Sequence, residues 1–188
     1  VDKDFKEDPI GETARYKNAR LTYFIGDFEW AQAQLKVLKS ATSELIANDA
    51  LNLSVLITEN STPEDTTNAV LHAFAKADFL SYIRDYEGAN QILDSLFKLN
   101  EKEPIIDDIL MLKAKNALAT KATNLAIDYL KLIVERYNDD VLADDALYQL
   151  AQLYQNTLKD EKQAKLYFEQ LIMQFPNSTY VQDARAAI

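Results

Sequence analysis

The sequence lacks the residues that most enzyme chemistry requires. It contains no cysteine, so disulfide bonds and thiolate chemistry are excluded. Its three glycines are too few and too scattered for a glycine-rich phosphate-binding loop. The single histidine, His72, has no second histidine near it, whereas a metal site needs several converging ligands. We therefore expect no catalytic residue, no cofactor and no metal site, and an enzyme is the least favoured class.

Long apolar runs are also missing. No stretch reaches the roughly 18 residues that a membrane-spanning helix needs, and no signal peptide is visible. The chain begins at Val1 rather than at methionine, which indicates a processed or trimmed start. A composition without cysteine fits the cytoplasm and equally a periplasmic or cell-envelope protein, so the sequence predicts no compartment.

Basic residues are outnumbered, because 20 Lys and Arg stand against 30 Asp and Glu, for a net charge of -10. Nucleic-acid phosphates and anionic lipid headgroups repel such a chain, and no local basic cluster offsets this. Nucleic acid is therefore not an expected partner. Acidic pairs at 107–108, 139–140 and 144–145 lack the glycine-centred alternation of a calcium loop. We interpret them as helix starts, where carboxylates complement the helix dipole.

The composition and the periodicity of the chain are helical. It is 48% hydrophobic with only four prolines, which favours an all-α protein with a sizeable core. Between Ala164 and Phe175, apolar residues fall at i, i+4, i+7, i+8 and i+11, which is one stripe of an α-helix. Pro176 cannot continue that helix, and a new apolar-periodic segment follows it.

The same arrangement recurs along the chain. Four alanines, each followed four residues later by a large apolar residue, are 58, 37 and 38 residues apart: Ala31, Ala89, Ala126 and Ala164. Acidic residues at four further helix starts show steps of 59, 37 and 38: Asp49, Asp108, Asp145 and Asp183. The two sets of residues are independent of each other, yet their spacings are nearly the same. This predicts a repeating unit of two helices, which is the signature of an α-solenoid.

The segment from Tyr148 to Pro176 resembles a tetratricopeptide repeat (TPR). Its helices carry the small, aromatic and apolar residues of that family's pattern, followed by the closing proline: Leu150, Ala151, Tyr154, Ala164, Phe168, Leu171 and Pro176. The stretch GDFEWA, from Gly26 to Ala31, is similar to the family's turn between helices. The resemblance implies an all-α, right-handed α-solenoid of TPR-like helix hairpins. The stretch FPNSTYVQDA is more narrowly similar to bacterial cell-envelope TPR proteins of the outer-membrane assembly lipoprotein and Tol-Pal coordinator type.

The spacing also predicts the domain organisation. We expect an N-terminal extension over 1–10 and one TPR-like domain over 11–188, with repeats at 11–42, 43–102, 103–139 and 140–177 and a further helix starting in 178–188. The second repeat is expanded by about one helix, so three helices are expected there, the added one starting with Thr62 as N-cap and Pro63. The fourth repeat has one extra residue, which we place in the turn within 156–164.

In the TPR family the first helix of each pair lines a concave groove, and the resemblance assigns ten residues to it. These residues are Tyr16, Arg20, Tyr23, Phe74, Asp78, Met111, Lys115, Tyr148, Gln152 and Gln155. Aromatic residues, Arg and Met are enriched at binding hot spots. The alternative is packing against a neighbouring helix, which is the preferred interpretation for Phe74 and Met111. Two basic residues in the groove, Arg20 and Lys115, would favour an acidic or C-terminal peptide group.

The sequence therefore predicts a protein–protein interaction scaffold that binds a partner segment in the concave groove and has no catalytic activity. The alternative is a structural segment of a larger TPR array or cell-envelope assembly that self-associates through its ends. Residues 183–188 favour this alternative, because they read as a helix cut short. Trp30 is interpreted as a plug against the added helix, since large exposed apolar side chains are uncommon unless they are used.

Overall fold

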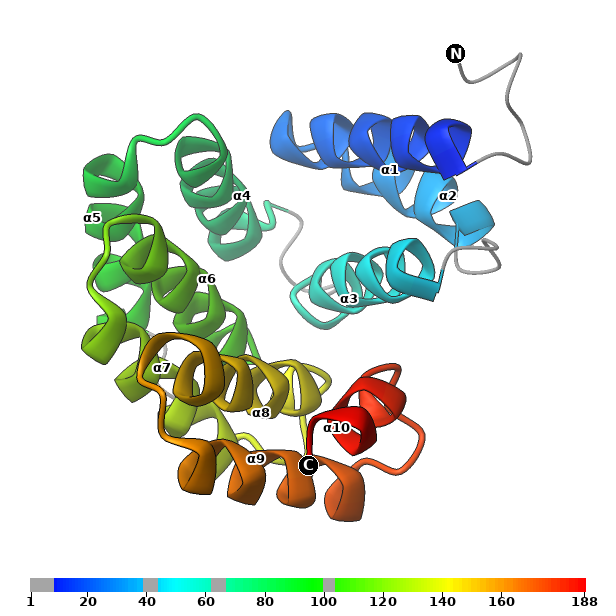
Figure 1. Cartoon of the computed structure of the whole chain (residues 1–188). Coiled ribbons are helices and arrows are strands. Elements are labelled where there is room, and N and C mark those ends of the chain that lie inside the picture. The colour runs from blue at the N-terminus through cyan, green and yellow to red at the C-terminus, as the bar shows by residue number, and fades with distance from the viewer. Residues whose placement is uncertain (1–8, 39–43, 62–66, 100–103) are drawn as a thin grey trace. The chain divides into compact units, whose positions relative to one another are not determined.

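The computed structural model of the chain describes residues 9–38, 44–61, 67–99 and 104–188, and these form helices joined by turns, without a strand (Figure 1). The first five helices are α1 (Pro9–Phe24), α2 (Phe28–Leu38), α3 (Glu44–Glu59), α4 (Ala69–Tyr82) and α5 (Tyr86–Leu99). The next five are α6 (Ile106–Ala119), α7 (Thr123–Arg136), α8 (Ala143–Gln152), α9 (Glu161–Gln174) and α10 (Val181–Ala187). A π-helical turn, η1 (Leu153–Thr157), follows α8. The prediction of an all-α chain is confirmed.

The helices form two compact units, residues 1–105 and 106–188. In the first unit α1 packs on α2, α4 packs on α5, and α3 packs on α2. In the second unit α6 packs on α7 and α8 on α9, while α7 also contacts α8 and α9 contacts α10 (Figure 1). Helices that are adjacent in sequence are thus paired in space, which is the packing of a TPR-like helical solenoid.

Each hairpin turns at a residue in the left-handed backbone conformation. These residues are Gly26, Arg84, Lys121 and Lys159, with φ of 85°, 69°, 63° and 56°. They are 58, 37 and 38 residues apart, the same steps as the four marker alanines that follow them by five residues. The marker alanines are all buried, with at most 2% exposure. The repeat predicted from the sequence is therefore a structural repeat with a fixed turn.

Aspartate starts the second helix in three of the four hairpins. The carboxylates of Asp27, Asp85 and Asp160 each accept a hydrogen bond from the backbone N–H three residues later, at 3.0–3.1 Å. Such a cap satisfies one of the free N–H groups at a helix start and contributes about 1 kcal/mol. Helix α7 is the exception, because Ala122 stands at its start and provides no side-chain cap.

The expanded second repeat does contain three helices, but the added helix is not the one that we predicted. The sequence predicted a repeat helix starting near Asp49 and an added helix starting at Thr62. In the structure α4 packs on α5 and shares the turn at Arg84, whereas α3 packs on α2 and also contacts α1. Asp49 lies inside α3 rather than at a helix start. The predicted N-cap Thr62 and Pro63 lie outside the described residues.

The extra residue of the fourth repeat is accommodated inside the first helix of the pair. From Ala114 to Ala151 the step is 37 residues, whereas from Lys121 to Lys159 it is 38, so the additional residue lies between Ala151 and Lys159. There the chain forms η1, in which the N–H of Leu158 donates to the carbonyl of Leu153, five residues earlier, at 3.0 Å. A π-helical turn is the usual way for an α-helix to absorb one inserted residue. The predicted location in the turn was therefore wrong by a few residues.

The core of each hairpin is built from small residues on the first helix and large ones around them. Four alanines of α1, α4, α6 and α8 are fully buried: Ala19, Ala77, Ala114 and Ala151. Their size lets neighbouring helices approach closely. Trp30 does not belong to this core, because 59% of it is exposed on α2, so the prediction that it acts as a plug was wrong.

Candidate partner-binding surface

The residue that directly follows each fully buried alanine is polar in all four hairpins. These residues are Arg20 on α1, Asp78 on α4, Lys115 on α6 and Gln152 on α8. All four had been assigned to the groove from the sequence. Successive residues of an α-helix are rotated by about 100°, so the residue after a buried alanine lies at the edge of the helix–helix contact. At this position each of the four first helices carries a hydrogen-bonding side chain.

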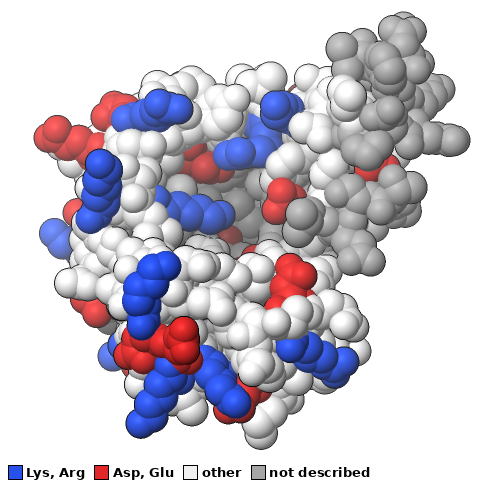
Figure 2. Space-filling model, viewed as in Figure 1, with Lys and Arg blue, Asp and Glu red and all other residues white. Residues whose placement is uncertain are grey.

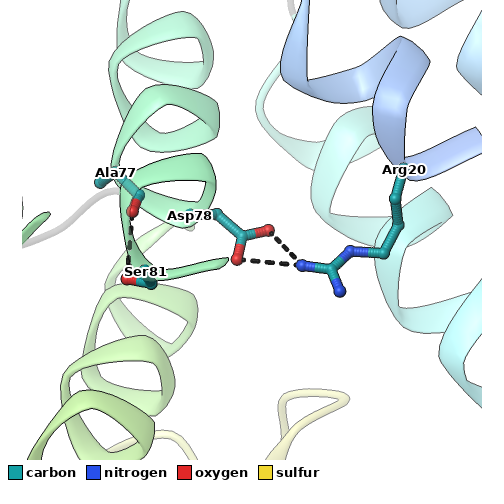
Figure 3. Close-up of polar contacts among 4 residues, drawn as sticks. All are labelled: Arg20, Ala77, Asp78 and Ser81. Atoms are coloured by element: carbon teal, nitrogen blue, oxygen red, sulfur yellow. Dashed lines mark hydrogen bonds and ion pairs between the residues drawn. The ribbon is translucent and has the colours of Figure 1, made fainter. Parts of the chain in front are cut away.

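In the first unit, Arg20 and Asp78 occupy this position on neighbouring helices and bind each other. One terminal guanidinium nitrogen of Arg20 lies 3.3 Å from both carboxylate oxygens of Asp78 (Figure 3). The guanidinium carbon also lies 5.0 Å from the ring centre of Phe24 and 5.4 Å from that of Tyr82. The side chains remain 29% and 20% exposed, so the pair is accessible to solvent but its charges are already compensated.

Tyr16 lies one helical turn before Arg20 and brings a third helix into the same region. Burial raises the pKa of its phenol, the carboxylate of Asp49 on α3 raises it further, and nearby Arg20 opposes the shift. Asp78 adds a smaller increase in this pKa. The phenol is therefore neutral and partly shielded, and it stands among two carboxylates and one guanidinium. Helices α1, α3 and α4 together build a polar and aromatic surface in this unit.

Three of the residues assigned to the groove are not accessible in the structure. Tyr23 is fully buried, and Phe74 and Met111 are 4% and 3% exposed. The ring of Tyr23 packs against those of Phe24 and Phe28, with centres 5.6 and 5.9 Å apart. Packing against neighbouring residues was the alternative for all three side chains, and we leave them out of the candidate surface.

In the second unit, Tyr148 is held by α10. Its ring stacks on that of Tyr180 with centres 4.3 Å apart, and its hydroxyl donates to Asp183 at 3.4 Å. In return the hydroxyl of Tyr180 donates to Asp145 on α8 at 2.5 Å. Burial and the carboxylate of Asp183 raise the pKa of Tyr148. These reciprocal contacts fix α10 against α8.

Gln152 extends this network, because its amide donates to the hydroxyl of Tyr148 at 3.2 Å. Gln155 is half-buried in η1, and Lys115 is exposed on α6. The structure thus leaves Lys115, Tyr148, Gln152 and Gln155 at least partly accessible in the second unit, with Tyr148 held by its contacts to Tyr180 and Asp183. Tyr180 was not predicted from the sequence. Its contact could have been found from spacing, because Asp145 and Tyr180 are 35 residues apart, as are Tyr148 and Asp183.

Two of the three acidic pairs lie at helix starts, whereas the pair at 139–140 lies in the turn between α7 and α8, so its interpretation as a helix start was wrong. The carboxylate of Asp107 accepts from the N–H of Asp108 at 2.9 Å, and that of Asp144 from the N–H of Asp145 at 2.8 Å, both in the first turn of a helix. Within the described part of the chain, no group of three acidic or histidine side chains could hold a metal ion. Figure 2 shows basic and acidic side chains interspersed over the face in view, rather than one large patch of a single sign.

The comparisons with known proteins bear on the second unit. Residues 145–178 match the family model of the tetratricopeptide repeat, which covers α8, η1 and α9. No curated protein and no solved structure matches the chain. The match supports a TPR protein, and TPR proteins are typically non-catalytic scaffolds for protein–protein interaction. It concerns the general repeat, and the narrower similarity to cell-envelope proteins stays a prediction. None of the described helices has the length and apolar character needed to cross a membrane.

Proposed function

We propose that this chain is a non-catalytic scaffold that binds a segment of a partner protein along the first helices of its hairpins. The observation that carries the proposal is the register position described above, where a hydrogen-bonding residue follows a buried alanine on α1, α4, α6 and α8. Close helix packing requires the alanine, but it does not require the residue after it to be polar, with a different charge in different hairpins. Within each unit, such groups on two neighbouring first helices are suited to fixing the backbone and side chains of a bound segment.

The second candidate function is a structural segment that self-associates. The arrangement of α10 is the observation that favours it, because this short helix is held on α8 by two tyrosine–aspartate contacts and leaves Ile188 51% exposed. A helix in this position is placed as the first helix of the next pair would be. Concentration-dependent mass in sedimentation, lost when Ile188 is replaced by serine, would favour self-association over partner binding.

A pull-down from the source cell with charge-exchanged baits tests the first proposal. The bait R20D/D78R keeps an ion pair between α1 and α4 but exchanges the two charges that a partner meets. A matched control exchanges the exposed pair on α9, in K165E/E169K, whose charged atoms are 3.8 Å apart. Both baits should keep the helical content of the original chain, which circular dichroism measures.

We expect a partner that the original chain and the α9 control retain and that R20D/D78R loses by roughly tenfold or more. A second bait, K115A/Q152A, tests the other unit, and a partner that spans both units should bind it more weakly. A partner that is retained equally by all baits would show that the first helices are not the binding face. Recovery of no partner by any bait, together with self-association, would favour the structural role.

A further inference from the structure

An exposed apolar surface lies where α1 and α4 end, beside the Arg20–Asp78 pair. We call it the apolar collar, formed by Leu21, Phe24, Ile25, Phe79, Tyr82 and Ile83. Ile25 is 81% exposed, and the other members apart from Phe24 are 39–56% exposed. Its three rings join the two helices, because the ring of Phe24 lies 5.6 Å from that of Phe79 and 5.7 Å from that of Tyr82. Exposed apolar patches of this kind mark interaction sites in monomeric proteins.

The collar is built from equivalent positions of two neighbouring hairpins. Counted back from the left-handed residues Gly26 and Arg84, Ile25 matches Ile83, Phe24 matches Tyr82 and Leu21 matches Phe79. The fold itself does not require apolar residues there, since the hairpin of α6 and α7 has polar or small residues at the same positions: Asn116, Ala119 and Thr120. The hairpin of α8 and α9 has Tyr154, Thr157 and Leu158 at these positions, so only the first two hairpins carry the full apolar set.

The rim of the collar is acidic. Four exposed carboxylates follow the two turns within a few residues: Asp27, Glu29, Asp85 and Glu87. The basic residues in this region are Arg84 at the turn, Arg20, whose charge Asp78 compensates, and the exposed Lys17 and Lys76, which lie one helical turn before Leu21 and Phe79 and so on the side of the collar away from the turns. An apolar surface with this rim complements a ligand that has an apolar face and basic residues beside it.

We propose that the apolar collar binds a cationic amphipathic helix of a partner protein. Such a helix places large apolar side chains at i, i+3, i+4 and i+7 on the exposed rings and isoleucines, and its lysines or arginines face the acidic rim. This surface adjoins the Arg20–Asp78 pair, because Arg20 lies over the rings of Phe24 and Tyr82, but Ile25 and Ile83 belong to the collar alone. A partner could use either surface alone, and the two proposals can fail independently.

Fluorescence anisotropy with designed peptides tests the proposal. The probes are two labelled helical peptides with the same apolar face, one with lysine and one with glutamate on the polar face. The proteins are the original chain, the collar variant I25S/I83S, and the matched control V37S/M173S. The control replaces two apolar residues that are 61% and 80% exposed, on α2 and α9, so it removes a similar amount of exposed apolar surface away from the collar.

We expect the original chain and the control to bind the lysine peptide, with an affinity that falls as salt rises, and the glutamate peptide to bind roughly tenfold more weakly or worse. The collar variant should lose roughly tenfold or more in affinity for the lysine peptide. Thermal melts of the three proteins should agree, because all four replaced side chains are exposed.

Three results would overturn the proposal. The first is the absence of binding of the lysine peptide to the original chain, and the second is an equal loss of affinity in the collar variant and the control. The third is a dimer or vesicle-bound form of the original chain that I25S/I83S abolishes, since the collar would then be covered by a second copy or by lipid. The K115A/Q152A variant separates the two proposals, because it changes no residue of the collar or of its contacts with Arg20 and should still bind the lysine peptide.

Discussion

Replacing Gly26 with alanine is the sharpest test of how the first two hairpins are joined. Gly26 has a left-handed backbone with φ of 85°, but the equivalent turns use Arg84, Lys121 and Lys159, so this backbone alone does not demand glycine. A Cβ at Gly26 would lie 2.3 Å from Cε1 and 2.6 Å from Nδ1 of His72 on α4. The ring of His72 occupies the space that a side chain would need.

The cost of Gly26→Ala has two parts. The left-handed conformation costs a residue with a Cβ about 1 kcal/mol relative to glycine. The clash is relieved when the His72 ring moves away, which breaks its contact with Phe28, whose ring centre is 4.7 Å away. Such ring contacts contribute about 0.5–1.5 kcal/mol. We therefore expect a loss of about 2 kcal/mol in the free energy of unfolding.

A double-mutant cycle with His72→Ala separates the two parts. In the His72→Ala background the Gly26→Ala change should cost only about 1 kcal/mol, because the clash is gone and the backbone cost remains. Denaturant unfolding followed by the fluorescence of Trp30, the only tryptophan, reports on the first unit. Arg84→Ala is the matched control at the equivalent turn of the same unit and should change stability by less than about 0.5 kcal/mol. An equal cost of Gly26→Ala with and without His72 would refute the assigned role of His72.

Three further changes test other contacts. Because the pKa of Tyr16 is raised in the folded state, the folded protein keeps the phenol proton where the unfolded chain loses it. The free energy of unfolding should therefore be unaffected by this group below pH 10.0 and should decrease above it, by up to about 1.4 kcal/mol per pH unit. Tyr16→Phe should flatten this alkaline decrease when unfolding is measured as a function of pH. Asp160→Ala removes the cap of α9 and should cost about 1 kcal/mol in denaturant unfolding, whereas Asp160→Asn should cost less. Ala122→Asp should supply the missing cap of α7 and raise the melting temperature by a few degrees.

The fold class and the repeat could be predicted because their signals are local. A stripe of apolar residues, a buried alanine and a helix-ending proline each act within a few turns of chain. The identity of the added helix is not local, since α3 and α4 both read as amphipathic helices and only packing decides which one joins α5. One overlooked signal would have decided it: Ile83-Arg84-Asp85 repeats Ile25-Gly26-Asp27 at the same distance from a marker alanine.

The sequence indicated which helix positions to consider for the candidate surface, but not which of their side chains are exposed. Sequence register correctly aligned Arg20 with Asp78, yet it carried no information on whether equivalent side chains meet. Helix contacts also decide burial, since Tyr23 lies on the predicted stripe but is covered completely by neighbouring side chains. Residues of the collar were missed for the opposite reason, because exposed apolar residues near a turn have no periodic signal of their own.

The Arg20–Asp78 pair changes what can be inferred about a partner's charge. The sequence suggested an acidic peptide group, because Arg20 and Lys115 were counted as two free cations. In a stack of hairpins, equivalent positions on neighbouring first helices lie side by side, so opposite charges at one register position compensate each other inside the protein. The exposed carboxylates that remain near the ends of α1 and α4 are those of Asp27 and Asp85, beside the turns. At the apolar collar the charge that a partner meets is set by the carboxylates beside the turns, and this is why we propose a basic segment as its ligand.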